Sequence, residues 1–435
     1  MEYKNEALKE QFEDVENILF SANITNEEAQ DLQLLKEKQG KRLISSEAKA
    51  YQDFLKAYSS VSGYHIFKGD MDALADSDVV ISFGVWFGDE MMESISSARK
   101  TVEAENPKFV YMHPIEDASL QSSITQFIKY EVGSEEGVAA LLAHTLLEEK
   151  EVPSGIEELL EELDIGYLSA ESNVGEEELE SMYEQIDETT RVSLMIGSDL
   201  YGHSKADQIA KLVALLEKYA GVNVVCLPPA KNALGVALIC QLDDALEGKS
   251  ALYETCHNGT YLNANRCFFL PNETALCDID QHTILDFSEA LPKDQGFQTI
   301  DRNDLKQQCI YKLLPQERKE ALELDEVDDL PVYDGALVYT YHVEKVKEDE
   351  GQKRDILTGS KQFALATKLQ DGDQITYEVG GVKFQRVFKI DTHMKGVIAL
   401  NPVFDIKLSA DLISSYRFSR LAFEKINQNI GNDNE

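Results

Sequence analysis

Residues 191–242 decide the expected fold and read RVSLMIGSDLYGHSKADQIAKLVALLEKYAGVNVVCLPPAKNALGVALICQL. The continuous apolar run VSLMIG predicts a parallel strand that is buried on both faces. After a polar turn, apolar side chains recur at helical spacing from Ala206 to Leu216, which predicts an amphipathic helix. VNVVCL predicts the next strand, which the Pro228-Pro229 pair ends because proline cannot extend a ladder. Together these segments predict a βαβ unit.

Residues 78–114 repeat the same pattern. VVISFG predicts a buried strand that ends at Gly84, the turn VWFGDE and a helix follow, and FVYMHP predicts a second strand that ends at Pro114. Two such units are typical of two α/β domains or of two halves of one doubly wound sheet. We expect the first arrangement, with two Rossmann-like doubly wound domains over residues 1–190 and 191–330.

The hydrophobic period changes after the acidic stretch LELDEVDDLP, residues 322–331. The segments ALVYTYHVEKV, QITYEVGGVKFQRVFKI and GVIALNP alternate between apolar and polar residues, which predicts strands. Gly380-Gly381 lies where a two-residue hairpin turn would fall. We therefore expect a small β-barrel domain over residues 331–435, with one helix around KQFALATKL.

The charge of the chain limits its partners. Among 435 residues, 79 are acidic and 41 are basic, which gives a net charge of −38. A surface of that charge repels nucleic acid and anionic lipid, so we expect neither as a direct partner. No apolar run is long enough to cross a membrane, and the first residues lack the pattern of a signal peptide, so we expect a cytoplasmic protein. Residues 135–190 hold 18 acidic residues and one basic residue, which indicates a solvated face or a contact with a basic partner.

The turns after the predicted strands are the first candidate sites, because dinucleotides bind there in α/β proteins. Neither GVWFGDE nor GSDLYGHSKAD contains the GxGxxG phosphate fingerprint. Both place carboxylates where a phosphate would lie, those of Asp89, Glu90 and Asp199. A carboxylate at this position stabilises the helix dipole and repels an anion, which favours a structural role for the turns.

Cysteine and histidine residues give weaker signals. Cys256, His257, Cys267 and Cys277 lie close together, but the sequence lacks the CxxC pairs that common zinc and iron–sulfur sites use. We expect thiols here, because a reducing compartment disfavours disulfides. His113 lies at a strand end, where a structural role is commoner than a catalytic one. We therefore assign no catalytic, cofactor-binding or metal-binding residue.

Several segments together resemble a known family. SDVVISFG, FVYMHPIED, YEVGSEEGVAALLAH, MIGSDLYGHSKADQIAKLVALLEKY and PPAKNALGVALICQLDD look like the large G subunit of bacterial NADH-quinone oxidoreductase, respiratory complex I. CHNGTYLNANRCFFLPNETAL is similar to its EGT..N...R..P.N.AL stretch, and LTGSKQFALATKLQDGDQITYEV resembles the barrel domain of molybdopterin-dependent oxidoreductases. The resemblance covers nearly all of the chain and implies a molybdopterin oxidoreductase-like fold.

The departures from this family concern its cofactors. The family's N-terminal part holds 2Fe–2S and 4Fe–4S clusters, whereas this chain has no cysteine before Cys226. It resembles a form that begins after the iron–sulfur domains, and the residue that would bind molybdenum in the related enzymes is missing as well. We therefore expect no iron–sulfur cluster and no molybdopterin in this chain.

The resemblance and its departures together imply a structural subunit of the complex I peripheral arm. It would contact the other peripheral-arm subunits on the cytoplasmic side of the inner membrane, without inserting into the membrane directly. One alternative is the catalytic chain of a molybdopterin-dependent oxidoreductase, such as a formate dehydrogenase, with its iron–sulfur part on another chain. Another is a small-ligand dehydrogenase with an unconventional nucleotide loop.

Overall fold

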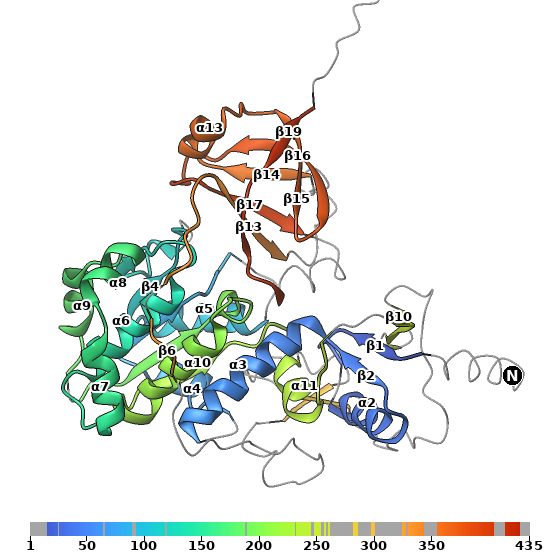
Figure 1. Ribbon diagram of the computed structural model, residues 1–435, viewed down its shortest axis with the longest axis horizontal. Coiled ribbons are helices and arrows are strands. Elements are labelled where there is room, and N and C mark those ends of the chain that lie inside the picture. Colours follow the sequence, from blue (N-terminus) through green and yellow to red (C-terminus); the bar gives the residue numbers. More distant parts are fainter. Residues whose placement is uncertain are drawn as a thin grey trace, which may run out of the picture.

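A computed structural model describes most of the chain between residues 15 and 426. The described residues are 15–24, 26–63, 66–88, 93–117, 120–187, 189–230, 232–244, 248–253, 324–327, 329–342, 355–403 and 414–426, with four short strands between 256 and 300. They form a mixed α/β part and a curled sheet stacked on it (Figure 1).

A five-stranded parallel sheet forms the centre of the α/β part. Its strands are β3 (Val79–Phe83), β4 (Lys108–Met112), β5 (Gln126–Ile128), β6 (Val192–Ile196) and β7 (Asn223–Cys226). They lie in the order β5-β4-β3-β6-β7, and all neighbours are parallel. Every residue of β3 and β6 is buried, as the apolar runs predict.

The two βαβ units are therefore two halves of one doubly wound sheet. β3 pairs with β6 along its whole length, from Val79 opposite Val192 to Phe83 opposite Ile196. The expected division into two α/β domains between residues 190 and 191 is wrong, because that position lies inside this sheet. A strand buried on both faces also needs a neighbour on both edges, and β6 supplies the second neighbour of β3.

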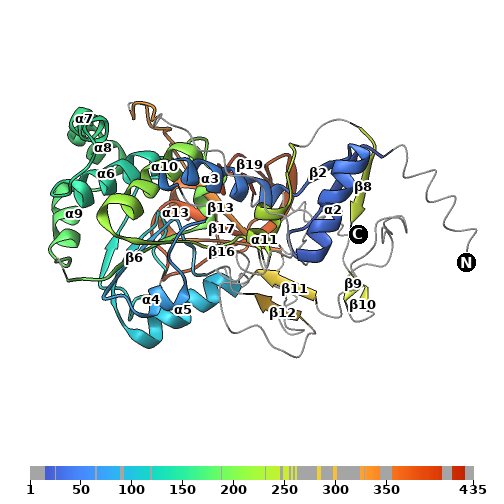
Figure 2. The ribbon, with the colours of Figure 1, turned by 90° about the horizontal axis from the view of Figure 1, so that it is seen from below.

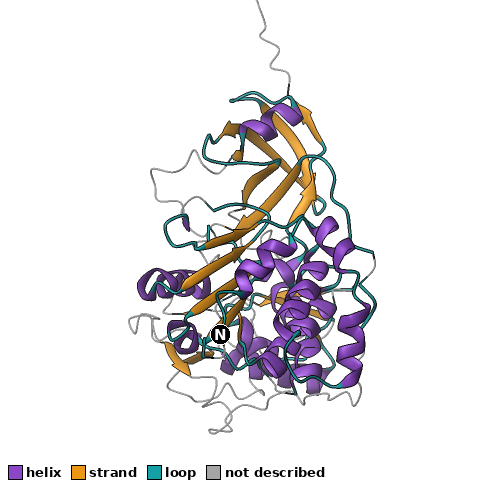
Figure 3. Cartoon of the chain, turned by 90° about the vertical axis from the view of Figure 1, so that its left-hand side faces the viewer, coloured by secondary structure: helices purple, strands orange, loops and turns teal. Residues whose placement is uncertain are grey.

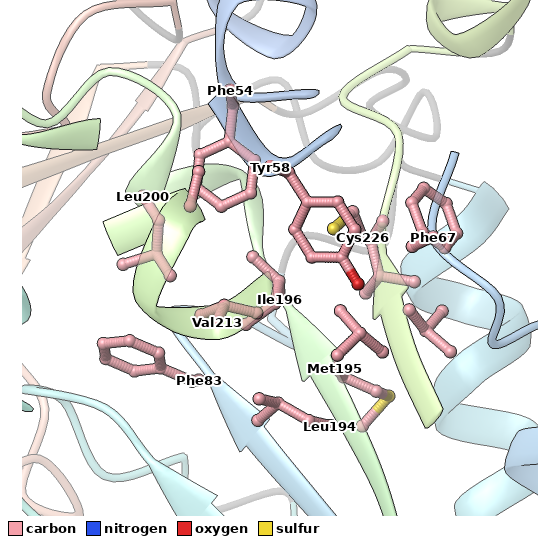
Figure 4. Packing of buried hydrophobic residues seen from close by; sticks show 14 of the residues in the cluster. Phe54, Tyr58, Phe67, Phe83, Leu194, Met195, Ile196, Leu200, Val213 and Cys226 are labelled. Carbon is pink, nitrogen blue, oxygen red and sulfur yellow. The ribbon is translucent and has the colours of Figure 1, made fainter. Parts of the chain in front are cut away.

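Helices cover both faces of this sheet (Figure 2). One layer contains α3, α6 and α10, in which α10 contacts both of the others, and the other contains α4 and α5. The bounds are α3 (Ser46–Ser62), α4 (Met71–Ala75), α5 (Glu93–Glu105), α6 (Glu135–Leu147), α7 (Ser154–Glu162), α8 (Ile165–Ser172), α9 (Glu176–Tyr183) and α10 (Ala206–Leu215), which continues as a π-helical turn (Leu216–Ala220). In Figure 4, Phe54 and Tyr58 of α3 pack toward Ile196 of β6 and Val213 of α10.

A second, three-stranded parallel sheet joins distant parts of the chain. β1 (Asn17–Phe20) lies between β2 (Arg42–Ile44) and β8 (Ser250–Tyr253). Helices α2 (Asn26–Gln39) and α11 (Ala233–Ile239) contact each other beside it.

The PPAKNALG motif, residues 228–235, holds the N-terminal segment against α11 by hydrogen bonds and close packing. The Asn232 side chain donates hydrogen bonds to the Ile24 carbonyl at 2.7 Å and to the Asn26 Oδ1 atom at 3.1 Å. Gly235 lies so close to these groups that a Cβ atom there would stand 2.2 Å from Asn26 Oδ1. The N-terminal segment therefore packs with residues 232–253, and the motif has a structural role.

The C-terminal part is a curled seven-stranded sheet (Figure 3). Its order is β18-β13-β17-β14-β16-β15-β19, and α13 (Lys361–Thr367) lies beside it. The bounds are β13 (Leu337–His342), β14 (Ile356–Gly359), β15 (Gln374–Val379), β16 (Val382–Ile390), β17 (Ile398–Val403), β18 (Phe418–Arg420) and β19 (Phe423–Lys425). The two edge strands, β18 and β19, follow each other in the sequence, so one short segment spans both edges of the sheet.

The hairpin expected at Gly380-Gly381 is confirmed, since β15 and β16 are antiparallel neighbours and both glycines have positive φ. Four short strands form two further ladders, β9 (Cys256–His257) with β10 (Thr260–Tyr261) and β11 (His282–Leu285) with β12 (Phe297–Ile300). In the described part of the chain, no helix is both long and apolar enough to cross a membrane.

Candidate functional site

The candidate site lies at the carboxyl ends of β3 and β6. From β3 the chain adds β4 and β5 on one side, and from β6 it adds β7 on the other. Open α/β sheets bind ligands at such a switch point, in the crevice beyond the strand ends. Two loops meet there, residues 84–88 after β3 and residues 197–205 after β6. We call this place the switch-point crevice.

The glycines of these two loops allow the loop backbones to pack closely against each other. A Cβ atom on Gly197 would lie 1.8 Å from the Gly84 carbonyl oxygen, so the two backbones touch. Gly84 has φ of +65°, which disfavours other residues, and a Cβ atom there would lie 2.7 Å from Leu200 Cγ. The glycines therefore bring the loops together, and Leu200 packs directly against the first of them.

A buried charge network fills the crevice around Asp199. Its carboxylate lies 3.0 Å from His113 Nε2, accepts a hydrogen bond of 3.0 Å from the Tyr339 hydroxyl, and lies 3.2 Å from Arg417 Nη1. Arg417 Nη2 also donates to Ser198 Oγ at 2.5 Å. The side chains of His113, Asp199 and Arg417 are at most 1% exposed. The network thus joins three parts of the fold, namely β4, the loop after β6, and the curled sheet.

Because this network is buried, the pairing of its charges matters for the stability of the fold. An isolated buried carboxylate costs several kcal/mol, and a cationic partner with further hydrogen bonds offsets that cost. Arg417 supplies the charge, and the Tyr339 hydroxyl and His113 supply the hydrogen bonds. The curled sheet therefore provides the groups that allow Asp199 to be buried.

His113 is enclosed as part of this network. Its Nδ1 atom lies 3.0 Å from the Ile115 amide nitrogen and 3.1 Å from the carbonyl oxygen of the same residue. The Trp86 ring lies 5.5 Å from the His113 ring, and the Tyr111 ring stacks on it at 5.7 Å. The imidazole has partners at both nitrogens and is fully buried, a geometry that orients loops and leaves no face to a substrate.

A second buried network lies beside the first. His203 Nε2 lies 3.3 Å from Glu135 Oε2 and 3.2 Å from the Gly133 carbonyl oxygen. The Tyr416 hydroxyl donates to Glu135 Oε1 at 2.6 Å and accepts from the Gly133 amide at 2.8 Å. Burial alone would lower the pKa of His203, but the hydrogen bond and charge of Glu135 raise it above its ordinary value. This network ties α6 to the segment before β18.

Backbone packing adds to the contact between the α/β part and the curled sheet. A Cβ atom on Gly202 would lie 2.4 Å from the Ser415 carbonyl carbon, so the loop after β6 touches the segment that carries Tyr416 and Arg417. The turn GSDLYGHSKAD was expected as a structural element or a nucleotide loop, and its Ser198, Asp199 and His203 all bind the curled sheet or α6.

Most of the remaining predicted candidates lie outside the described residues, namely Asp89, Glu90, Cys267 and Cys277. Cys256 and His257 form β9, whose side chains are not described. Cys226 and Cys240 are buried free thiols, and burial raises the pKa of Cys240. Within the described ranges, no group of three or more His, Cys, Asp or Glu side chains is arranged to hold a metal ion.

A pocket of about 490 Å³ lies beside the crevice, between α3 and the loop that contains His203. Its lining includes the carboxylates of Asp53, Asp207 and Asp243. Each of them already pairs with a lysine, Lys49, Lys211 and Lys36 respectively. The charges of these three pocket carboxylates are therefore compensated by lysines of the same chain.

Sequence reasoning identified Asp199 and His113 but missed Tyr339, Arg417 and Tyr416. The latter lie in ordinary alternating or aromatic stretches of the C-terminal part, such as SSYRFSR, which carry no motif. The available signal was an arginine flanked by two aromatic residues in a strongly acidic chain.

Comparisons with known proteins show the fold alone. No family model matches the chain, and no curated protein matches it by sequence. Among solved structures, acetylene hydratase from Pelobacter acetylenicus is similar with a TM-score of 0.55 and 8% sequence identity, over 95% of this chain and 84% of that chain.

Proposed function

We propose that the chain is a peripheral-arm subunit of a bacterial NADH-quinone oxidoreductase, with a structural role and no redox centre of its own. The resemblance of its sequence segments to the G subunit supports the family. The buried pair of Asp199 and Arg417 in the switch-point crevice carries the structural role, because it fills the place where an enzyme of this fold would bind its ligand.

The acidic helices provide the proposed contact surface. α7 and α9 bury Ile156, Leu160, Leu179 and Met182 against the rest of the fold. Their glutamates face outward, and the first turn of α9 alone contains Glu176, Glu177 and Glu178. A surface of this kind complements a basic neighbour, such as another peripheral-arm subunit, and would hold the chain at the cytoplasmic side of the inner membrane.

Co-purification tests this proposal. A tagged full-length chain isolated from membranes solubilised in mild detergent should bring down other complex I subunits at fixed stoichiometry. Reversing three charges at exposed positions in the second half of α7 (Glu158→Lys, Glu161→Lys, Glu162→Lys) should weaken this association at unchanged thermal stability, because lysines near a helix C-terminus do not oppose the helix dipole. The same number of reversals on exposed acidic positions of the curled sheet (Asp371→Lys, Glu378→Lys, Glu424→Lys) provides the control. A chain that is recovered alone from native membranes contradicts the proposal.

A second candidate is the catalytic chain of a molybdopterin-dependent oxidoreductase, such as a formate dehydrogenase. The likeness of the fold to acetylene hydratase favours it. The crevice does not fit a pterin dinucleotide, since the buried Asp199 carboxylate would repel its anionic groups and Arg417 is already paired with Asp199. Pterin fluorescence released on denaturation, together with stoichiometric molybdenum, would favour this candidate over the structural subunit.

A further inference from the structure

We propose that the curled sheet acts as an internal ligand of the switch-point crevice: Tyr339 and Arg417 occupy the position of a dinucleotide and close the crevice to nucleotides. This inference concerns the chain alone and goes beyond its assignment to a complex. It therefore holds or fails independently of any partner subunit.

Charge is the first argument. A nucleotide phosphate binds where backbone N–H groups at a helix N-terminus face a vacant position. In this chain Asp199 lies in a short 3-10 turn (Ser198–Leu200) between β6 and α10, and its buried carboxylate would repel a second anion in the crevice. The guanidinium that could attract a phosphate, that of Arg417, already binds Asp199 and Ser198.

Space is the second argument. The loops touch at Gly84 and Gly197, and Leu200 packs against Gly84. On the other side the Trp86 ring lies 5.6 Å from the Tyr339 ring, and Phe418 lies 4.8 Å from Tyr339. These side chains come from both the α/β part and the curled sheet, and all of them are buried. The crevice is thus filled with aromatic rings.

Three buried donors remain beside the network. The Trp86 Nε1 atom and the hydroxyls of Tyr111 and Tyr130 have no hydrogen-bond partner within the described structure. Each is covered by a neighbouring ring: Tyr130 by Phe83 of β3 at 5.6 Å, Tyr111 by His113 at 5.7 Å, and Trp86 by Tyr339 of the curled sheet at 5.6 Å. Of the three, Trp86 is the one that the curled sheet covers directly.

The second network holds the curled sheet in place. Tyr416, one residue before Arg417, is anchored to Glu135 and Gly133, and Gly202 packs against Ser415. Opening the crevice would break these contacts and leave the Asp199 carboxylate buried without its cation. Closure is therefore part of the native fold.

The chain contains a natural probe of this closure. Trp86 is its single tryptophan and lies inside the crevice. In the wild-type full-length chain we expect short-wavelength emission that acrylamide quenches poorly. NAD⁺ or GDP at millimolar concentration should change neither the emission, after correction for nucleotide absorbance, nor the thermal midpoint.

Two arginine variants form a matched pair. Arg417→Ala removes the buried cation, so Trp86 emission should move to longer wavelength and acrylamide quenching should rise several-fold. Arg420→Ala removes an exposed arginine of β18, three residues further along the chain, whose guanidinium donates to the Val332 carbonyl. Its spectrum and quenching should equal those of the wild type.

Two results would overturn the proposal. One is saturable binding of either nucleotide to the wild-type chain, seen as a change in Trp86 emission or a raised thermal midpoint. The other is Trp86 quenching in Arg417→Ala that equals that in Arg420→Ala. If Arg417→Ala does not fold, Tyr339→Phe replaces it, because it removes one hydroxyl and should still raise quenching. The nucleotide measurement on the wild type needs no variant.

Discussion

The guanidinium of Arg417 lies 3.2 Å from the carboxylate of Asp199, and both side chains are almost completely buried. This pair links the curled sheet to the loop after β6. Neither part of the fold could bury its charged residue alone, because each charge is compensated by the other part. The interface is therefore a condition for the stability of both sides.

The first prediction concerns the free energy of unfolding of the arginine pair. Arg417→Ala leaves the Asp199 carboxylate buried without a cation and should cost about 3–5 kcal/mol. Arg420→Ala changes an exposed residue and should stay within about 0.5 kcal/mol of the wild type. Urea denaturation monitored by circular dichroism measures both values. Equal losses for the two variants would show that burial of the pair contributes nothing to stability.

The second prediction concerns pH. Glu135 and Glu136 face His203 and raise its pKa above the ordinary value of 6.5, against the opposing effect of burial. A raised folded-state pKa gives stability that is fully present below 6.5 and is lost as the pH rises through the folded value. The wild type should therefore exceed His203→Gln most in stability at acid pH, and the difference should shrink toward alkaline pH.

Thermal midpoints of both proteins between pH 5.5 and 9 give this difference directly. His393 lies on an exposed turn of the curled sheet, so His393→Gln is the matched control and should track the wild type at every pH. A difference between the wild type and His203→Gln that grows with pH would contradict the assigned direction.

Local structure was predictable from the sequence, and the pairing of distant elements was not. The runs VSLMIG and VVISFG predict buried strands, because continuous apolar residues need cover on both faces. Their periodicity is equally compatible with one sheet or two, so the pairing of β3 with β6 could be seen only in the structure. The same holds for β1 and β8, which the sequence places far apart.

For the candidate site, too, the sequence showed one residue but not its distant partners. The sequence shows Asp199 as a carboxylate at the start of a helical segment, and this alone argues against a phosphate there. Its partners Tyr339 and Arg417 follow from how the curled sheet docks, which depends on surface shape at many points. No local pattern in SSYRFSR specifies the surface that this segment contacts.

The third prediction tests the contact of the two crevice loops. Gly197→Ala would place a methyl group 1.8 Å from the Gly84 carbonyl oxygen, and backbone must move to relieve this overlap. We expect a loss of about 3 kcal/mol or more in the free energy of unfolding, at the upper end of overpacking costs.

Gly155→Ala is its control. Gly155 lies in α7 with no atom within 4 Å of a built Cβ, so alanine there should be neutral or stabilise by up to about 1 kcal/mol. If Gly197→Ala is as stable as Gly155→Ala in urea denaturation, the two loops do not touch as described.

The last prediction tests the attachment of the N-terminal unit. Asn232→Ala removes the donor that holds the Ile24 carbonyl and leaves this buried carbonyl without that hydrogen bond, which should cost about 1–3 kcal/mol. Asn23→Ala is the matched control, because Asn23 is exposed and its amide nitrogen donates to Ser21 Oγ two residues away. Because Ile24 links β1 to α2, amide hydrogen exchange should also accelerate in β1 and α2 of Asn232→Ala, while α6 and α10 stay protected. Uniform acceleration across the whole chain would instead mean that the N-terminal unit and the five-stranded sheet unfold together.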